Sequence, residues 1–121
     1  MDPLASALHR VSRVPGVTGA LIVEADAGVP VMAELSEGVE GNAVAALAAA
    51  LFRRTSNAVD AAGFGRLTTF HLEAEQGHVI ASGAGDLVVV AIVGDDAQLG
   101  LVRVETHRAA ESLRAAAEST G

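Results

Sequence analysis

One stretch, residues 40–62, restricts the fold of this chain more than any other part of the sequence. Residues 43–52 form ten consecutive positions without a charged side chain, and six of the ten are alanine. Alanine and leucine are among the strongest helix formers, so we expect a helix over residues 40–62. A helix on a protein surface normally keeps one polar face. Because this segment lacks such a face over its first half, two of its sides must be shielded from water by other parts of the protein or by a partner.

We expect one side of this helix to lie on a β-sheet and the other to meet a second protein surface. The larger side chains form one apolar stripe, and the small alanines behind it let a partner helix approach closely. The stripe is Val44, Leu47, Ala48, Leu51, Ala58 and Val59, with Ala43, Ala46 and Ala50 behind it. The sequence leaves open which side meets the sheet. The alternative is that the helix is merely rich in alanine, a weak hydrophobe, and that water covers its second side.

The segment before this helix is typical of one helix followed by two strands. Asp2 and Pro3 form a favourable helix start, because Asp caps and Pro suits the first helical position. Residues 17–24 are apolar on both alternating sets, which indicates a strand in the centre of a sheet. Residues 29–35 are typical of the returning strand. Since Pro30 has no backbone N–H to donate, we expect this strand on the outside of the sheet.

The segment after the alanine-rich helix is typical of three strands and a final helix. These are a strand at 66–75, a turn at 76–77, a strand at 78–82, a turn at 83–86, a strand at 87–93 and a helix from 98 to about 118. Residues 66–75 alternate, which predicts a strand with one drier face. Residues 87–93 are all apolar, which predicts a second central strand.

The predicted fold class is α+β, with the order helix, strand, strand, helix, strand, strand, strand, helix. Strands joined by short turns are antiparallel. We therefore expect three layers: a central five-stranded antiparallel sheet with one helix on one face and two on the other. Residues 1–121 are predicted to form a single domain.

Composition excludes several classes of function. The net charge is −7, so binding to nucleic acid or to an anionic membrane surface is not expected. All eight cationic side chains are arginine, which rules out Schiff-base and phosphate-loop lysines, and cysteine is absent. The first residues lack a signal-peptide pattern, and no uncharged run is long enough to span a bilayer. We expect a cytoplasmic protein.

No local pattern predicts a catalytic, cofactor or metal site. A turn at Gln76-Gly77 would pair Glu75 with His78, and His71 with Ser82. The two histidines would then lie about 13 Å apart, too far to share one ion. Residues 83–85 contain two glycines, but a strand follows them, so they predict a hairpin turn and not a phosphate loop. We therefore expect no catalytic residues, no cofactor and no bound metal.

Three motifs give the chain a resemblance to the Roadblock-type (dynein light chain, longin-like) domain family. Residues 14–23, VPGVTGALIV, are similar to the family's Pro-Gly-Val-x-Gly-Ala entry into its first strand. Residues 26–30, DAGVP, resemble its turn and return, although Ala27 separates Asp from Gly. Residues 96–103, DAQLGLVR, resemble the start of its last helix, with Gln98 where Asn is common. The resemblance implies a Roadblock/profilin-like fold over nearly the whole chain.

The resemblance also implies how such a domain assembles. Family members form dimers by packing their middle helices side by side and continuing the sheet across the third strand of each subunit, here residues 66–75. The implied homodimer interface comprises Ala43, Ala46, Leu47, Ala50, Arg54, Asn57, Leu67, Thr69 and His71. The helix implied by the family is therefore the one that composition alone singled out.

Bacterial family members bind and regulate small Ras-like GTPases, and in some of them the dimer stimulates GTP hydrolysis by the partner. The resemblance therefore implies a non-enzymatic, homodimeric partner of a small GTPase. Arg53, Arg54 and Asn57, which follow the charge-free half of the helix, are the candidate partner-binding residues. Two alternatives stand beside this hypothesis: a dimerising scaffold subunit with no effect on nucleotide turnover, and a small-ligand sensor with an apolar cavity between sheet and helices.

Overall fold

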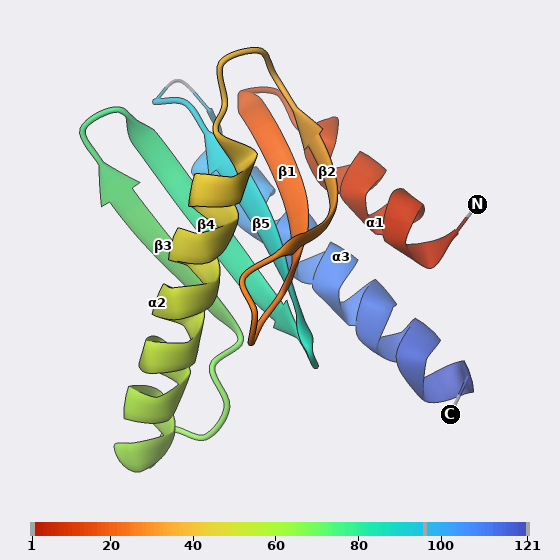
Figure 1. The fold of residues 1–121 in the computed structure, drawn as a ribbon, viewed down its shortest axis with the longest axis vertical. Coiled ribbons are helices and arrows are strands. Elements are labelled where there is room, and N and C mark those ends of the chain that lie inside the picture. The colour runs from red at the N-terminus through yellow and green to blue at the C-terminus, as the bar shows by residue number, and fades with distance from the viewer. Residues whose placement is uncertain (1, 96, 121) are drawn as a thin grey trace.

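The computed structural model describes residues 2–95 and 97–120, so Asp96 of the third motif lies outside the described residues (Figure 1). The elements follow the predicted order. They are α1 (Pro3–Ser12), β1 (Val17–Glu24), β2 (Pro30–Leu35), α2 (Gly41–Ala61), β3 (Thr69–Ala74), β4 (Gly77–Ala84), β5 (Leu87–Val93) and α3 (Leu99–Thr120). The side chain of Asp2 caps α1 as expected, by accepting a hydrogen bond of 3.2 Å from the backbone N–H of Leu4.

The five strands form one antiparallel sheet in the order β2-β1-β5-β4-β3. The two strands predicted to be central, β1 and β5, have a neighbour on each side. The strand that contains Pro30 lies at one edge, as predicted, and β3 lies at the other. The edge position of β2 follows from backbone chemistry, because a proline interrupts the hydrogen bonding that a central strand needs.

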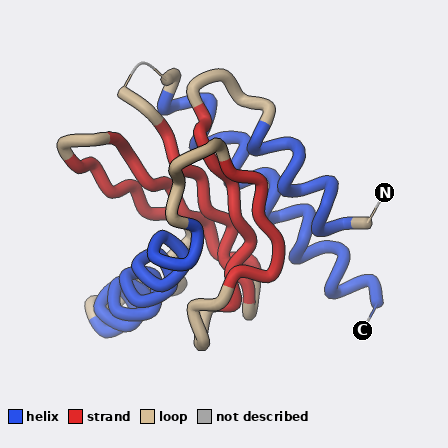
Figure 2. The backbone as a smooth tube through the Cα atoms, turned by 45° about the horizontal axis from the view of Figure 1, so that its top comes forward, coloured by secondary structure: helices blue, strands red, loops and turns tan. Residues whose placement is uncertain are grey.

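Helices cover both faces of this sheet (Figures 1 and 2). On one face α1 and α3 pack on each other and on the strands, and on the other face α2 lies alone. Alternate residues of β1 enter the two cores: Ile22 lies with Leu8 and Val102 beneath α1 and α3, while Leu21 and Val23 lie beneath α2. Burial on both sides explains why β1 and β5 are almost continuously apolar.

The sequence leaves open which side of α2 meets the sheet, and in the structure it is not the side that carries Leu47 and Ala58. The side chains that reach the sheet are Ala45, Ala48 and Ala49, all fully buried, whereas Leu47 is 44% exposed and Ala58 is also exposed. Phe52 sets the rotation of the helix. Its ring packs closely over Gly83, where an added Cβ would lie 2.6 Å from the ring. With an aromatic anchor at one point, small side chains elsewhere bring the helix close to the strands, and no room is left there for a leucine.

The register predicted for the β3–β4 hairpin is wrong by two residues. The turn is Glu75-Gln76, Gly77 already pairs with Ala74, and Glu73 rather than Glu75 lies opposite His78. A shift of two keeps every side chain on its predicted face, because side chains alternate with a period of two. It does change which side chains meet across the strands. The turn predicted at 83–86 is also shorter, since β4 continues to Ala84.

Candidate functional site

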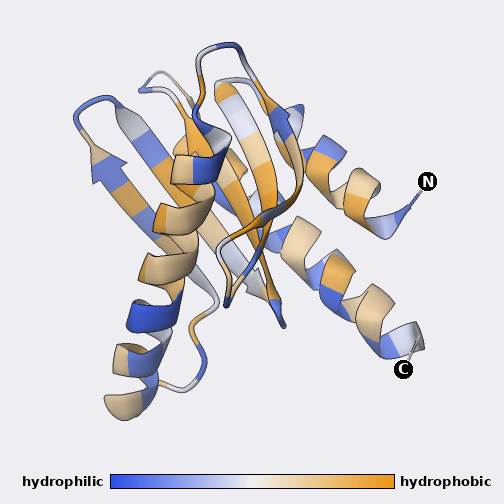
Figure 3. Ribbon diagram, viewed as in Figure 1, coloured by the Kyte–Doolittle hydropathy of each residue, from blue (hydrophilic) through white to orange (hydrophobic). Residues whose placement is uncertain are grey.

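The outward side of α2 carries an apolar stripe that no other described element covers. Ala43, Ala46 and Leu47 are exposed on it, and Ala50 is half-buried. Spacings of three and four residues place them along one side of the helix, opposite the alanines that meet the sheet. In Figure 3 the upper turns of α2 are apolar towards the viewer, and a hydrophilic band follows them. This stripe contains the apolar helical residues of the predicted dimer interface, and Arg54 and Asn57 follow it on the same helix.

Polar residues follow the stripe along α2, and they differ in whether their side chains make hydrogen bonds within the domain. One terminal nitrogen of Arg53, Nη1, donates to the backbone carbonyls of Ala25 and Asp26, at 2.9 and 3.2 Å, and so ties α2 to the β1–β2 turn. Arg54 and Asn57 are exposed, and their side chains make no hydrogen bond or ion pair within residues 2–95 and 97–120. Of the three candidate partner-binding residues, these two are the ones that leave polar groups available to another molecule.

The free edge of β3 is the second part of the candidate surface. Across the described sheet β3 pairs only with β4. Gly83 donates its backbone N–H to the carbonyl of Thr68, so Phe70 and Leu72, which follow in the same alternation, also bond towards β4. The backbone N–H and C=O groups of His71 therefore point out of the sheet. Such an edge can accept a further strand.

An aromatic contact joins the β3 edge to α2. The rings of Phe52 on α2 and Phe70 on β3 are 6.0 Å apart between centroids, and both side chains are half-buried. The contact shows that α2 and β3 meet on the same face of the sheet. Thr69 and His71 lie on β3, whereas Leu67, which was predicted within a strand at 66–75, lies before the strand because β3 begins at Thr69. The role of these residues in dimerisation stays a prediction.

The histidine pair is the feature that sequence reasoning missed. Instead of lying about 13 Å apart, His71 Nε2 and His78 Nδ1 are 2.9 Å apart. His78 is buried, and its Nε2 lies 3.5 Å from an oxygen of the exposed Asp95. The correct two-residue turn would have placed the rings diagonally across the hairpin, within reach of each other. Among the residues that the structure describes, no group of three or more His, Cys, Asp or Glu side chains is arranged to hold a metal ion.

None of the described helices combines the length and the apolar character that a membrane-spanning helix needs.

Comparison with known proteins places the fold and the family. The Methanocaldococcus jannaschii protein MJ1340 is 29% identical over 108 residues, which cover 89% of this chain and 94% of that protein. Myxococcus xanthus MglB matches with a TM-score of 0.83 at 18% identity, over 96% of this chain and 95% of MglB. An MglB structure with a tetrameric arrangement also gives 0.83, at 22% identity, over 98% of this chain and 93% of that one.

These structural matches confirm the predicted three-layer α+β fold. The family follows from the sequence itself, because residues 5–93 match the family model of the Roadblock/LC7 domain, most of the 121 residues. The chain therefore belongs to the Roadblock/LC7 domain family.

Proposed function

We propose that this domain is a non-enzymatic, cytoplasmic homodimer that binds and regulates a small Ras-like GTPase. The observation that carries the proposal is the outward stripe of α2, on which Ala43, Ala46 and Leu47 are exposed. Exposure of these apolar side chains to water is unfavourable. A second copy of the same helix could cover them, because alanine side chains allow two helices to pack closely.

The free edge of β3 supports the same arrangement. If the β3 strands of two copies pair antiparallel, the two-fold axis is perpendicular to the joined sheet, and both α2 helices lie on the same face of it. The stripe and the edge are then covered by one symmetric interface. The family resemblance implies this arrangement, and the similarity to an MglB structure with a tetrameric arrangement supports self-association here.

The GTPase partner is expected on the paired α2 helices. Arg54 and Asn57 stand at the end of the apolar stripe with free polar groups, and arginine is favoured at protein interfaces. Arg53 contributes indirectly, because it fixes α2 to the β1–β2 turn.

The pockets also bear on the small-ligand alternative. A pocket of about 510 Å³ between α3 and β3 is lined mainly by exposed side chains and lies outside the two cores, so it does not favour a ligand buried between sheet and helix.

The test of partner binding uses a Ras-like GTPase from the same host, captured in its GTP-bound and GDP-bound forms by the tagged domain. We expect capture that depends on the nucleotide and that Arg54→Glu weakens at least about tenfold, since a repulsive charge then replaces an interface arginine. Arg13→Glu, the same charge change at an exposed position before β1, is the control. GTP turnover is measured in the same samples. Binding without a change in turnover would assign the scaffold role, and no capture in either state would contradict the proposal.

The dimer is tested separately with Ala46→Glu. A glutamate there would be desolvated without a partner in the paired helices, so we expect a monomer that keeps the wild-type circular dichroism spectrum and melting behaviour. Ala115→Glu, the same change at an exposed position of α3, should leave the mass of the wild type unchanged. Equal masses for the two variants in sedimentation would place the interface elsewhere.

A further inference from the structure

A groove lies on the face of the sheet opposite α2. There α3 packs mainly on β4 and β5, and β3 extends beyond it. The space between α3 and β3 has a volume of about 510 Å³. Its lining residues are Thr68, Thr69, Gly100, Arg103, Val104, His107 and Arg108. Gly100 keeps one end of this groove open, because an added Cβ would meet nothing within 4 Å.

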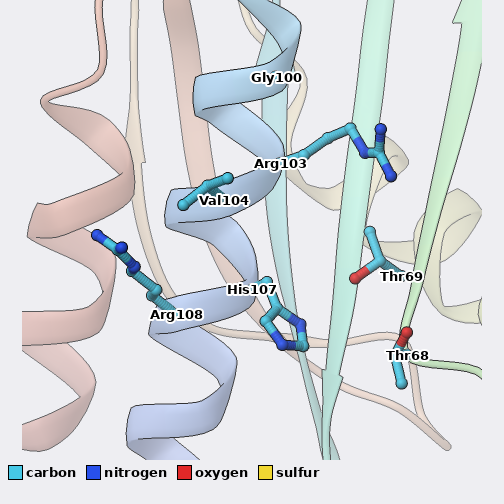
Figure 4. Close-up of a pocket in the computed structure, with 7 residues that line it drawn as sticks. All are labelled: Thr68, Thr69, Gly100, Arg103, Val104, His107 and Arg108. Atoms are coloured by element: carbon cyan, nitrogen blue, oxygen red, sulfur yellow. The ribbon is translucent and has the colours of Figure 1, made fainter.

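The groove is basic although the protein is acidic. Arg103 and His107 are four residues apart, so they share one side of α3, and Figure 4 shows both reaching from the helix towards β3. The described residues that line the groove include three basic side chains and no carboxylate, in a chain of net charge −7. Arg103 therefore brings a positive charge to this part of a negative surface, with His107 beside it.

The two arginines at the groove differ in their surroundings. Arg108 lies on the side of α3 that faces α1 in Figure 4, and its Nη1 is 3.3 Å from an oxygen of Glu105, which is also 4.0 Å from Arg10 of α1. Arg103 is exposed and forms no ion pair or hydrogen bond with any described residue. Its guanidinium group is free to bind a carboxylate from another molecule with two parallel hydrogen bonds.

We propose that this groove docks an acidic segment of a protein partner. Nucleic acid is disfavoured by the net charge. A small anion would stay largely in water, because the groove is formed by one helix and one strand with exposed side chains, whereas small-ligand sites enclose most of their ligand. An extended acidic segment instead contacts the whole length of the groove. Thr68 and Thr69 line the β3 side of the groove and can contact the segment between its charges.

The position of the groove makes this docking independent of the proposed GTPase surface. The groove and α2 lie on opposite faces of the sheet, so one domain can hold both partners at once. Every lining residue comes from the same chain, so the groove is complete in one copy, and Thr69 also belongs to the predicted dimer interface.

The test measures the fluorescence anisotropy of a short, fluorescein-labelled peptide of mixed glutamate and serine as the full-length domain is added. We expect saturable binding that weakens with salt and that is lost when glutamine replaces every glutamate. Arg103→Gln should weaken binding roughly tenfold, the change expected when one charge-assisted contact is lost. Arg103→Lys keeps the charge but not the paired donors. Its affinity for the peptide should lie between that of the wild type and that of Arg103→Gln.

Arg13→Gln is the matched control. It makes the same change at an exposed arginine that does not line the groove, and should alter the affinity by less than about twofold. Ala46→Glu on the opposite face should bind the peptide like the wild type. Three results would each overturn the proposal: no saturable binding by the wild type, equal binding of the glutamine peptide, or equal losses for Arg103→Gln and Arg13→Gln.

Discussion

At the scale of single residues, the close contacts of this fold depend on positions without a side chain. Gly16 precedes β1 with φ of +92°, in the left-handed region that favours glycine. A Cβ there would lie 2.8 Å from the Cα of Ala97, at the start of the segment that leads into α3. Backbone conformation and packing thus both require glycine at this position.

Replacement of Gly16 by alanine should reduce the free energy of unfolding by about 3 kcal/mol, because left-handed strain of about 1–2 kcal/mol adds to an overpacking term of similar size. Gly38→Ala is the matched control, since Gly38 has φ of +88° but an added Cβ would meet nothing within 4 Å. In Gly38→Ala only the backbone strain should reduce the free energy of unfolding, by about 1 kcal/mol. Urea unfolding of both variants measures the difference, and equal losses would show that the contact with Ala97 contributes nothing.

At the scale of elements, the sequence was sufficient to predict the order of the helices and strands, the two central strands and the edge strand that contains Pro30. It was not sufficient for the rotation of α2, because six alanines within ten residues give no difference in size between the two sides. The rotation depends on Phe52 meeting Gly83, a contact between residues far apart in the chain.

The hairpin of β3 and β4 shows a similar limit. Alternation fixes which side chains share a face, but it is unchanged when the register shifts by two. Glu75-Gln76 and Gln76-Gly77 are both acceptable turns, so the sequence did not reveal the contact between His71 and His78. The predicted interface residues were recognised through the family resemblance and the composition of α2, and neither of these depends on the register.

The exposed edge of β3 is tested with a change of backbone. His71→Pro removes an N–H that points out of the sheet and leaves the bonds of Phe70 and Leu72 to β4 in place. His71→Ala removes the same side chain, and its contact with His78, but keeps the N–H. If two β3 strands pair in the dimer, His71→Pro should weaken dimerisation roughly tenfold more than His71→Ala, the effect of about one hydrogen bond. Equal dimer dissociation constants from analytical ultracentrifugation would remove β3 from the interface.

At the scale of the whole molecule, the sheet separates two surfaces of different chemistry. One face presents α2, with its outward alanines, and the other presents the groove between α3 and β3, with Arg103 and His107. An apolar stripe suits a second copy of the chain, and a basic groove suits an acidic partner. The proposed function places the regulated GTPase on the first face and leaves the second available for another protein.

The most direct measurement is sedimentation equilibrium of the wild-type protein over a range of micromolar concentrations. The chain has a mass of 12.2 kDa, so cover of the α2 stripe by a second copy predicts a species of about twice that mass. A monomer at every concentration would mean that water alone covers Ala43, Ala46 and Leu47, and would contradict the account.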